Sequence, residues 1–198
     1  METLDLHGKK TMIRLDLNVP LKDGNVTSDA RIQAALPTIQ MAIDKGAKVI
    51  LLSHLGRPDP DNLDGSFSLE PVAKKLQEIL NINVSFQPNW LDGIKEESQG
   101  IVLCENVRYE AGEKKNDESL SKQIADLCDV YVMDAFGASH REHSSTYGAL
   151  KYAKEGCIGP LLSKEVSSIR KAIDDPQAPV TAIIGGAKVS SKLGVIEK

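Results

Sequence analysis

The stretch from Lys48 to Pro58 runs from a buried-strand pattern directly into a cationic turn. Its first part, Val49 to Ser53, is apolar or small without alternation, which is typical of a strand covered on both faces of a parallel sheet. The strand then gives way to His54, Gly56 and Arg57. Open α/β sheets bind ligands outside the carboxyl ends of their strands. One such turn alone would indicate a surface loop with a stray arginine, but the pattern recurs at four predicted strands.

Apolar runs of strand length alternate with segments of helical periodicity along the whole chain. Strands are predicted at 11–17, 49–53, 83–86, 101–104, 129–133 and 180–184, and helices at 29–46, 68–80, 119–127 and 161–174. Strands separated by helices predict βαβ units, hence an α/β fold with a doubly wound, Rossmann-like parallel sheet. Pro37 is expected to kink or interrupt the first helix. The charge-rich segment 111–118 is expected to be a solvated loop.

The prolines Pro176 and Pro179 mark the best domain boundary. The length of 198 residues exceeds the common domain size of about 100 to 150. We therefore predict an N-terminal ligand-binding domain over residues 1–160 and an interdomain helix and hinge over 161–179. Residues 180–198 would be the first strand, turn and helix of a second, incomplete α/β domain.

Composition limits the partners of the chain. The formal net charge of -4 and the pI of about 5.6 argue against nucleic acid or an anionic membrane as the main partner. The three cysteines are odd in number and lack CxxC spacing, so we expect buried, reduced thiols. No basic leader and no run of about 18 apolar residues is present, which predicts a cytoplasmic protein.

The polar side chains at the predicted strand ends suggest one composite anion site. They are Asp16 and Asn18 after the first strand, His54, Gly56 and Arg57 after the second, and then Arg108 and Arg141, with Arg31 at the start of the first helix. Arginine binds phosphate and carboxylate bidentately, and each charge-assisted bond contributes about 1.5 to 3 kcal/mol. The ligand predicted is small, phosphorylated and hydroxylated. Asp16 and Asn18 would orient the arginines or accept hydrogen bonds from a ligand hydroxyl.

Two further patterns are weaker. The glycine-rich segment 185–192 could bind phosphate at a helix N-terminus, but it is not a P-loop, and taken alone a structural turn explains it as well. His140 and His143 could hold a metal with Asp134, but no further histidine or carboxylate nearby completes a set. We therefore favour structural or anion-binding roles for both histidines.

The motifs that carry these residues resemble the phosphoglycerate kinase family. They are Arg14–Pro20, Asp23-Gly24 through Arg31-Ile32, Ser53–Pro58, Glu105–Arg108, Asp134–Gly137 with His140-Arg141, and Gly185–Val189. The resemblance covers the whole chain in order. Departures are Ser191 where many members have aspartate, Cys104 where leucine is common, and Glu142 where a small residue is usual. Members are two-domain enzymes of roughly twice this length, so the chain resembles the N-terminal half and the start of the nucleotide domain.

The resemblance implies a phosphotransferase that moves a phosphoryl group reversibly from 1,3-bisphosphoglycerate to ADP, giving 3-phosphoglycerate and ATP with magnesium. By this resemblance the substrate-binding residues are Asp16, Asn18, Arg31, His54, Gly56, Arg57, Arg108 and Arg141, the catalytic residues Arg31 and Lys188, and the nucleotide-binding residues Gly186, Lys188 and Lys192. Most magnesium and adenosine contacts would lie in the missing half. We therefore expect the isolated chain to be inactive and the full-length protein to be a monomer.

The residues themselves fit phosphoryl transfer between two anions, which needs charge neutralisation and alignment rather than a general base. Two other functions remain open. One is a metal-dependent phosphohydrolase that uses Asp16, Asp134 and the two histidines. The other is a non-catalytic anion-binding module.

Overall fold

The computed structural model describes residues 1–95 and 100–174, together with 176, 177, 179, 181 and 183. The chain divides into two compact units, Met1–Glu165 and Val166–Lys198. All the predicted strands except 180–184 belong to the first unit. The strand at 180–184, apart from two isolated residues, and the glycine-rich turn after it lie outside the described residues.

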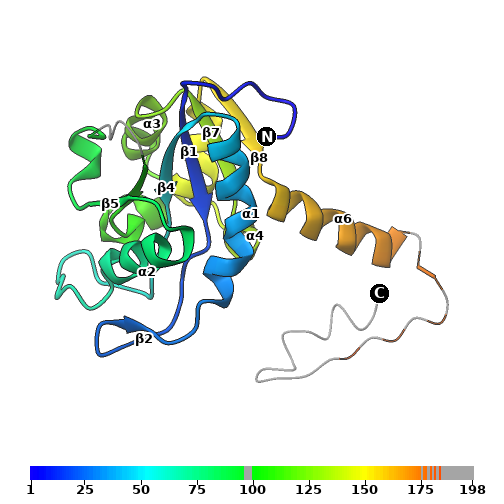
Figure 1. Cartoon of the computed structure of the whole chain (residues 1–198), viewed down its shortest axis with the longest axis horizontal. Coiled ribbons are helices and arrows are strands. Elements are labelled where there is room, and N and C mark those ends of the chain that lie inside the picture. The colour runs from blue at the N-terminus through cyan, green and yellow to red at the C-terminus, as the bar shows by residue number, and fades with distance from the viewer. Residues whose placement is uncertain (96–99, 175, 178, 180, 182, 184–198) are drawn as a thin grey trace. The chain divides into compact units, whose positions relative to one another are not determined.

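A parallel sheet of six strands forms the centre of the first unit, in the order β5-β6-β4-β1-β7-β8 (Figure 1). The strands are β1 (Lys10–Leu15), β4 (Lys48–Leu52), β5 (Val84–Gln87), β6 (Ile101–Cys104), β7 (Val130–Asp134) and β8 (Glu155–Ile158). A small antiparallel hairpin of β2 (Leu21–Lys22) and β3 (Asn25–Val26) follows β1. The predicted doubly wound parallel sheet is confirmed, and β8 is an additional strand.

Helices connect the strands. The longer ones are α1 (Ala30–Asp44), α2 (Glu70–Leu80), α3 (Glu118–Asp126) and α6 (Pro160–Asp174), and the shorter ones α4 (Phe136–Ser139), α5 (Ala149–Tyr152), η1 (Trp90–Asp92), η2 (Val107–Tyr109), η3 (Glu113–Lys115) and η4 (Ser144–Gly148). Helix α1 continues through Pro37, so the expected interruption is wrong. Thr38 and Ile39, which follow the proline, are both fully buried, and this packing offsets the hydrogen bond that proline cannot donate.

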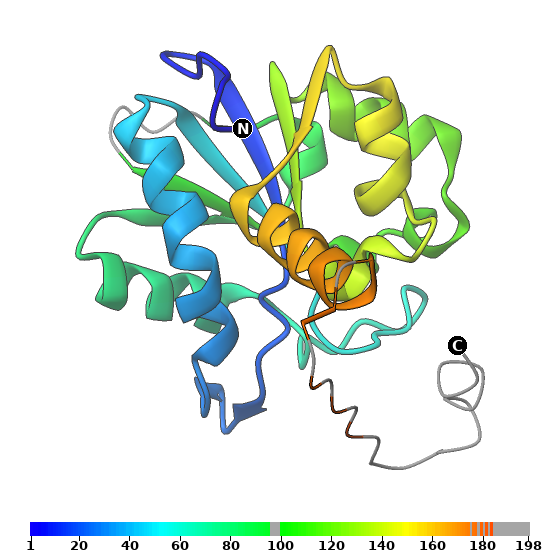
Figure 2. The same cartoon turned by 90° about the vertical axis from the view of Figure 1, so that its right-hand side faces the viewer.

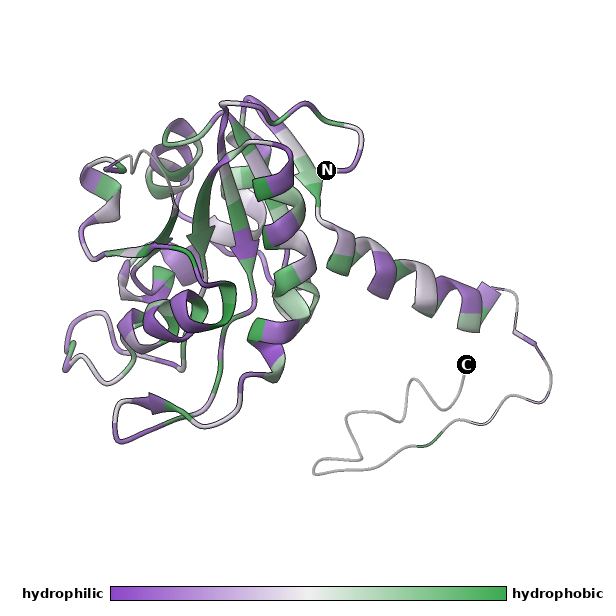
Figure 3. Cartoon of the chain, viewed as in Figure 1, coloured by the Kyte–Doolittle hydropathy of each residue, from purple (hydrophilic) through white to green (hydrophobic). Residues whose placement is uncertain are grey.

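Both faces of the sheet are buried, because successive side chains of a strand point to opposite sides. In β4, Val49 and Leu51 pack with α1 and α2, whereas Ile50 and Leu52 pack with α3 and α5. Figure 2 shows the sheet between these two helical layers. After Lys48, β4 is entirely apolar, and Figure 3 shows this strand largely in the hydrophobic colour, while the helices alternate between hydrophobic and hydrophilic residues. The continuous apolar pattern of the central strands therefore reflects burial on two sides.

The loops at the carboxyl ends of the strands diverge. Those after β1 and β4 lead to α1 and α2 on one face, and those after β6 and β7 lead to α3 and α5 on the other. Such divergence leaves an open crevice at the carboxyl edge, which is where α/β sheets bind ligands.

The segment 111–118 differs from its expectation. Most of its residues are exposed, as expected, but Glu113–Lys115 forms the helical turn η3 and the Glu113 side chain is buried. The high density of charge in this segment concealed one carboxylate that faces inward.

Candidate functional site

The predicted anion-binding residues follow four neighbouring strands of the sheet, β6, β4, β1 and β7. His54 and Arg108 are each only 5% exposed. Burial, and then the positive charges of Arg14, Arg108, Arg141 and Arg31, lower the pKa of His54 to about 2. Groups from β1, from the loops after β6 and β7 and from the start of α1 thus act on the imidazole that follows β4, and Arg57 acts on Arg108, which places them in one electrostatic cluster. We call Arg14, Arg31, Arg57, Arg108 and Arg141, together with His54, the arginine cluster.

Asp16 and Asn18 link the loops that follow β1 and β4. Arg31 Nη1 donates to Asp16 Oδ2 at 2.5 Å, and the backbone N–H of Asn18 donates to Asp16 Oδ1 at 3.2 Å. Asn18 Oδ1 in turn accepts from the backbone N–H of Gly56 at 2.8 Å. These contacts orient neighbouring groups of the cluster. Acceptance of a ligand hydroxyl by either side chain stays a prediction.

Gly56 has to be glycine in this turn. Its φ is +58°, a left-handed conformation that side chains rarely adopt. A Cβ atom here would also lie 2.1 Å from Phe67 Cδ1. An open pocket of about 250 Å³ lies beside the turn, lined in part by Asn18, Gly56 and Phe67. The conformation lets the chain pass from β4 to Arg57 without closing this space.

Arg108 enters the cluster from the loop after β6. Its Nη1 donates to the Gly56 carbonyl, while its Nε is buried with no hydrogen-bond partner among the described residues. Burial, and then the charges of Arg141 and Arg14, lower the pKa of Arg108 to about 10. Repulsion among these cations makes a bound anion electrostatically favourable.

Arg141 and Arg57 complete the cluster. Arg57 is exposed, and Arg141 is half-buried with its Nε 3.4 Å from Nε2 of the exposed His140. The Arg141 carbonyl accepts from Thr146 Oγ1 at 2.6 Å, so η4 holds the loop after β7. Both side chains are therefore at least partly accessible to a ligand.

Sequence analysis missed Arg14 as a site residue. Its guanidinium is buried, with Nη2 3.1 Å from His54 Nδ1 and Nε donating to Ser145 Oγ at 2.9 Å. The signal was present, because Arg14 is a charged residue between the apolar Ile13 and Leu15 of a predicted strand. A charge in such a position is rarely tolerated without buried partners.

Asp134 and the two nearby histidines do not assemble a metal site. The Asp134 oxygens accept from the Leu162 backbone N–H at 2.8 Å and from the Thr38 hydroxyl. Burial, and then Arg108 and Arg141, lower the pKa of His143 to about 4. Over the ranges 1–95 and 100–174, no group of three His, Cys, Asp or Glu side chains is placed to hold a metal ion. Asp134 instead fastens the beginning of α6 to α1.

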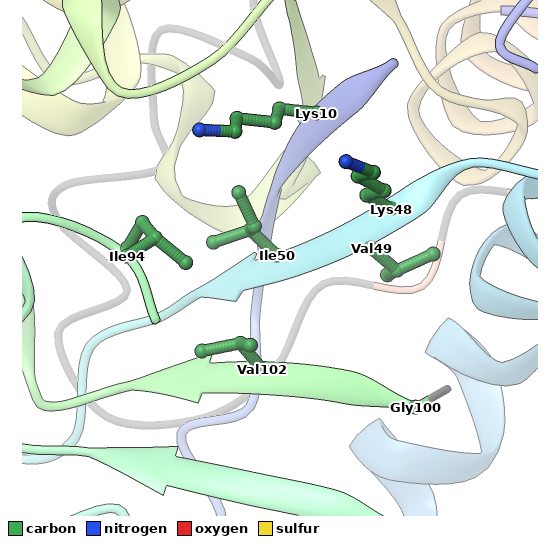
Figure 4. Close-up of a pocket in the computed structure, with 7 residues that line it drawn as sticks. All are labelled: Lys10, Lys48, Val49, Ile50, Ile94, Gly100 and Val102. Carbon is green, nitrogen blue, oxygen red and sulfur yellow. The ribbon is translucent and has the colours of Figure 1, made fainter. Parts of the chain in front are cut away.

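The amino edge of the sheet holds a second, smaller cavity, of about 20 Å³. Figure 4 shows Ile50, Ile94 and Val102 gathered around it, with the side chains of Lys10 and Lys48 above. This volume suffices for about one water molecule. This cavity is therefore too small for a substrate, whereas the pocket of about 250 Å³ beside Gly56 lies at the carboxyl edge, next to the turn that carries Arg57.

The predicted nucleotide-binding residues Gly186, Lys188 and Lys192 lie outside the described residues. In the part of the chain that is described, no helix is long and apolar enough to cross a membrane.

Comparison with known proteins gives consistent matches. The phosphoglycerate kinase family model matches residues 1–198. A curated phosphoglycerate kinase of Francisella tularensis subsp. novicida is 53% identical over 196 residues, which are 99% of this chain and 50% of that protein. The chain thus spans about half the length of the curated relatives it matches.

Solved structures agree with this assignment. The phosphoglycerate kinase from Coxiella burnetii superimposes with a TM-score of 0.92 at 49% identity, over 100% of this chain and 50% of that one. The enzyme from Pyrococcus horikoshii OT3 gives 0.87 at 32% identity, over 100% of this chain and 51% of that one. With a family model that matches from its first residue to its last, the chain belongs to the phosphoglycerate kinase family.

Proposed function

We propose that this chain forms the phosphoglycerate-binding part of a phosphoglycerate kinase, a glycolytic phosphotransferase. The reaction is reversible transfer of a phosphoryl group from 1,3-bisphosphoglycerate to ADP, giving 3-phosphoglycerate and ATP. The observation that carries the proposal is the convergence of arginines from β1, the loops after β6 and β7 and the start of α1 around a neutral, buried histidine that follows β4. Family membership supports the same reading.

The arginine cluster would bind the phosphate and carboxylate groups of 3-phosphoglycerate. Arg108, Arg57 and Arg141 would supply bidentate donors, and His54 one N–H donor. Asp16, Asn18 and Gly56 would hold the loops that present them, through the contacts between Arg31, Asp16, Asn18 and the Gly56 backbone. Because a carboxylate and a nucleoside diphosphate are already anionic, the reaction needs neutralisation and alignment rather than a base.

Arg31 and Lys188 are the residues to which we assign transition-state stabilisation. Arg31 lies at the beginning of α1 and is half-exposed, so its guanidinium can reach a migrating phosphoryl group while Asp16 steadies it. Gly186, Lys188 and Lys192 would contact the nucleotide. Magnesium, when bound with the nucleotide, supplies charge neutralisation on the phosphates. The described residues bring no three His, Cys, Asp or Glu side chains together to hold a metal ion, and we assign the magnesium ligands to other parts of the protein.

The proposal includes a domain organisation and a setting. Residues 1–160 would form the phosphoglycerate-binding domain, 161–179 the interdomain helix and hinge, and 180–198 the start of the nucleotide-binding domain. The protein would act in the cytoplasm as a monomer on small-molecule substrates, without nucleic acid or membrane.

Two other functions are less well supported. A metal-dependent phosphohydrolase would need Asp134 as a ligand, but both its oxygens accept hydrogen bonds from Leu162 and Thr38. A non-catalytic anion-binding module would use the same arginine cluster. It differs from the proposal only in the absence of phosphoryl transfer in the whole protein.

Calorimetry with 3-phosphoglycerate tests the site. We expect binding that weakens with added salt and falls about tenfold or more in Arg31→Ala and Arg141→Ala, a change of about 1.4 kcal/mol per decade. Arg170→Ala is the matched control, because Arg170 is exposed on α6, outside the cluster. Equal losses in all three variants would show a general charge effect, and unchanged affinity in Arg31→Ala and Arg141→Ala would remove the proposed site.

A further inference from the structure

Glu113 is a carboxylate buried behind the arginine cluster. Its residue is 1% exposed, and both oxygens accept hydrogen bonds from Ser145. Oε2 accepts from the Ser145 backbone N–H at 2.9 Å, and Oε1 accepts from Ser145 Oγ at 2.6 Å. A buried carboxylate is costly unless hydrogen bonds and opposite charges compensate it. The position of Glu113 therefore depends on Ser145 and on the other residues that Ser145 contacts.

Ser145 connects Glu113 to Arg14, and Arg14 to His54. Ser145 Oγ donates a hydrogen bond to Glu113 Oε1 and accepts one from Arg14 Nε at 2.9 Å. The other end of the guanidinium, Nη2, lies 3.1 Å from His54 Nδ1. Arginine has only donors, so Nδ1 has to be the acceptor, and the neutral ring then carries its proton on Nε2. The hydrogen bonds thus form one continuous path, from Glu113 through Ser145 and Arg14 to His54.

We propose that Glu113 is a positioning residue of the arginine cluster. Through Ser145 it fixes the orientation of Arg14, and Arg14 holds His54 as the neutral tautomer whose Nε2–H is free to donate to an anionic ligand. The identity of that ligand, 3-phosphoglycerate, rests on the proposed function. The hydrogen-bonded path does not, because every bond in it lies within the protein.

A simpler role for Glu113 predicts the opposite sign of effect. The five arginines of the cluster face two carboxylates, Asp16 and Glu113, and Arg14 and Arg108 are among the charges that act on Glu113. If Glu113 only reduced the positive charge, its neutralisation would strengthen the attraction for an anion. If it positions Arg14 and His54, its neutralisation weakens binding in spite of the more positive site. The sign of the change therefore separates the two roles.

Besides Arg14 and Arg108, the titratable groups on which the charge of Glu113 acts include Glu110 and Tyr131, and His143 and Lys114 are further neighbours. His143 Nδ1 lies 3.8 Å from Glu113 Oε1, too far for a hydrogen bond. Lys114 is next to Glu113 in η3, and its Nζ lies 3.5 Å from the Pro58 carbonyl. Neither replaces Ser145 as a partner of the carboxylate.

The first test measures binding of 3-phosphoglycerate by calorimetry at pH 7 and constant ionic strength. We expect Glu113→Gln and Ser145→Ala each to weaken binding about tenfold. The double variant should be no more than about threefold weaker than either single one, because both act on one path. Glu110→Gln, which removes a half-buried carboxylate three residues away that has no side-chain bond to Ser145, should stay within about twofold of the wild type. Unchanged or tighter binding in Glu113→Gln would overturn the proposal.

The second test requires no ligand. Long-range ¹H–¹⁵N correlation of the imidazole should show His54 of the wild type protonated on Nε2 alone. Ser145→Ala and Glu113→Gln should change the Nδ1 signal of His54, and Glu110→Gln should leave it unchanged. An Nδ1–H tautomer in the wild type, or identical spectra in all variants, would refute the path.

If the wild type failed to bind 3-phosphoglycerate, the proposed function would fail while these spectra still decided the role of Glu113. Ser145→Ala, which loses only a hydroxyl, decides it if Glu113→Gln does not fold.

Discussion

Two effects act in the same direction on His54. Burial disfavours the charged imidazolium, and the surrounding arginines disfavour it further, so the pKa falls from 6.5 to about 2. The unfolded chain has no such environment, and its histidine binds a proton near pH 6.5. Below that pH the unfolded state binds more protons than the folded state at this position. The free energy of unfolding therefore decreases as the pH falls from 6.5 towards 2.

This sign gives a prediction for stability. Between pH 6.5 and pH 5, His54 should lower the free energy of unfolding by about 1.6 kcal/mol, because the slope rises from half its limit at pH 6.5 towards about 1.4 kcal/mol per pH unit. His54→Asn keeps an acceptor near Nδ1 but does not titrate. Urea unfolding at both pH values should thus show a smaller loss for His54→Asn than for the wild type.

The comparison with the variant is needed because other groups also titrate. His143, with its pKa lowered to about 4, acts in the same direction as His54. Burial raises the pKa of Glu113 and of Asp134, so these carboxylates act in the opposite direction. These three groups are present in both the wild type and His54→Asn, so their contributions cancel when the two losses of unfolding free energy are compared. Equal losses for His54→Asn and the wild type would mean that His54 is not held neutral by its surroundings.

At the scale of elements, one amide side chain joins the loops that follow β4 and β6. Asn106 Nδ2 donates to the carbonyls of Leu55 and Phe67 at 2.8 and 2.9 Å. Its Oδ1 accepts from the backbone N–H groups of Leu55 and Arg108 at 3.2 and 3.1 Å. The placement of His54 and Arg108 in the cluster therefore depends on the contacts between the two loops that Asn106 provides.

We expect Asn106→Asp to destabilise the protein by about 3 kcal/mol in urea unfolding, because two buried carbonyls lose their donors and face an acceptor. Affinity for 3-phosphoglycerate should fall as well. Asn62→Asp makes the same change at an exposed position, and its effect should be below about 0.5 kcal/mol. A similar small effect at both positions would contradict the structural role given to Asn106.

Sequence patterns revealed the elements whose signal is local. The apolar runs of β4 and β6 and the glycine at the end of α1 were sufficient to place them, and Gly46 does adopt a φ of +70°. Strand β8 was missed because Glu155–Ile158 contains a charge and a glycine and is defined by pairing with β7. The buried residues behind the arginine cluster, Glu113 and Ser145, were missed because their contacts are not local in the sequence either. Glu113 and Ser145 meet only in the folded chain, and a charge-rich segment gives no sign of which carboxylate turns inward.

At the scale of the whole molecule, charge is distributed unevenly. The chain carries a net charge of -4, yet five of its six arginines gather at the carboxyl edge of one sheet. Such a local field concentrates anionic ligands at one place without making the protein a general polyanion binder. Phosphoryl transfer requires a second anion, the nucleotide, to be brought to the same place. The residues proposed for that task lie within 180–198, and the chain spans about half the length of its relatives.

We therefore expect the 198-residue chain to bind 3-phosphoglycerate but to show turnover far below the 1 to 100 per second typical of kinases. A coupled assay on highly purified protein measures this, and Lys188→Ala serves to detect contamination by a host enzyme. Residual turnover that is equal in the wild type and Lys188→Ala would come from a contaminant. Turnover in the typical range that Lys188→Ala abolishes would contradict the prediction, because these residues would then contain a complete site for both substrates.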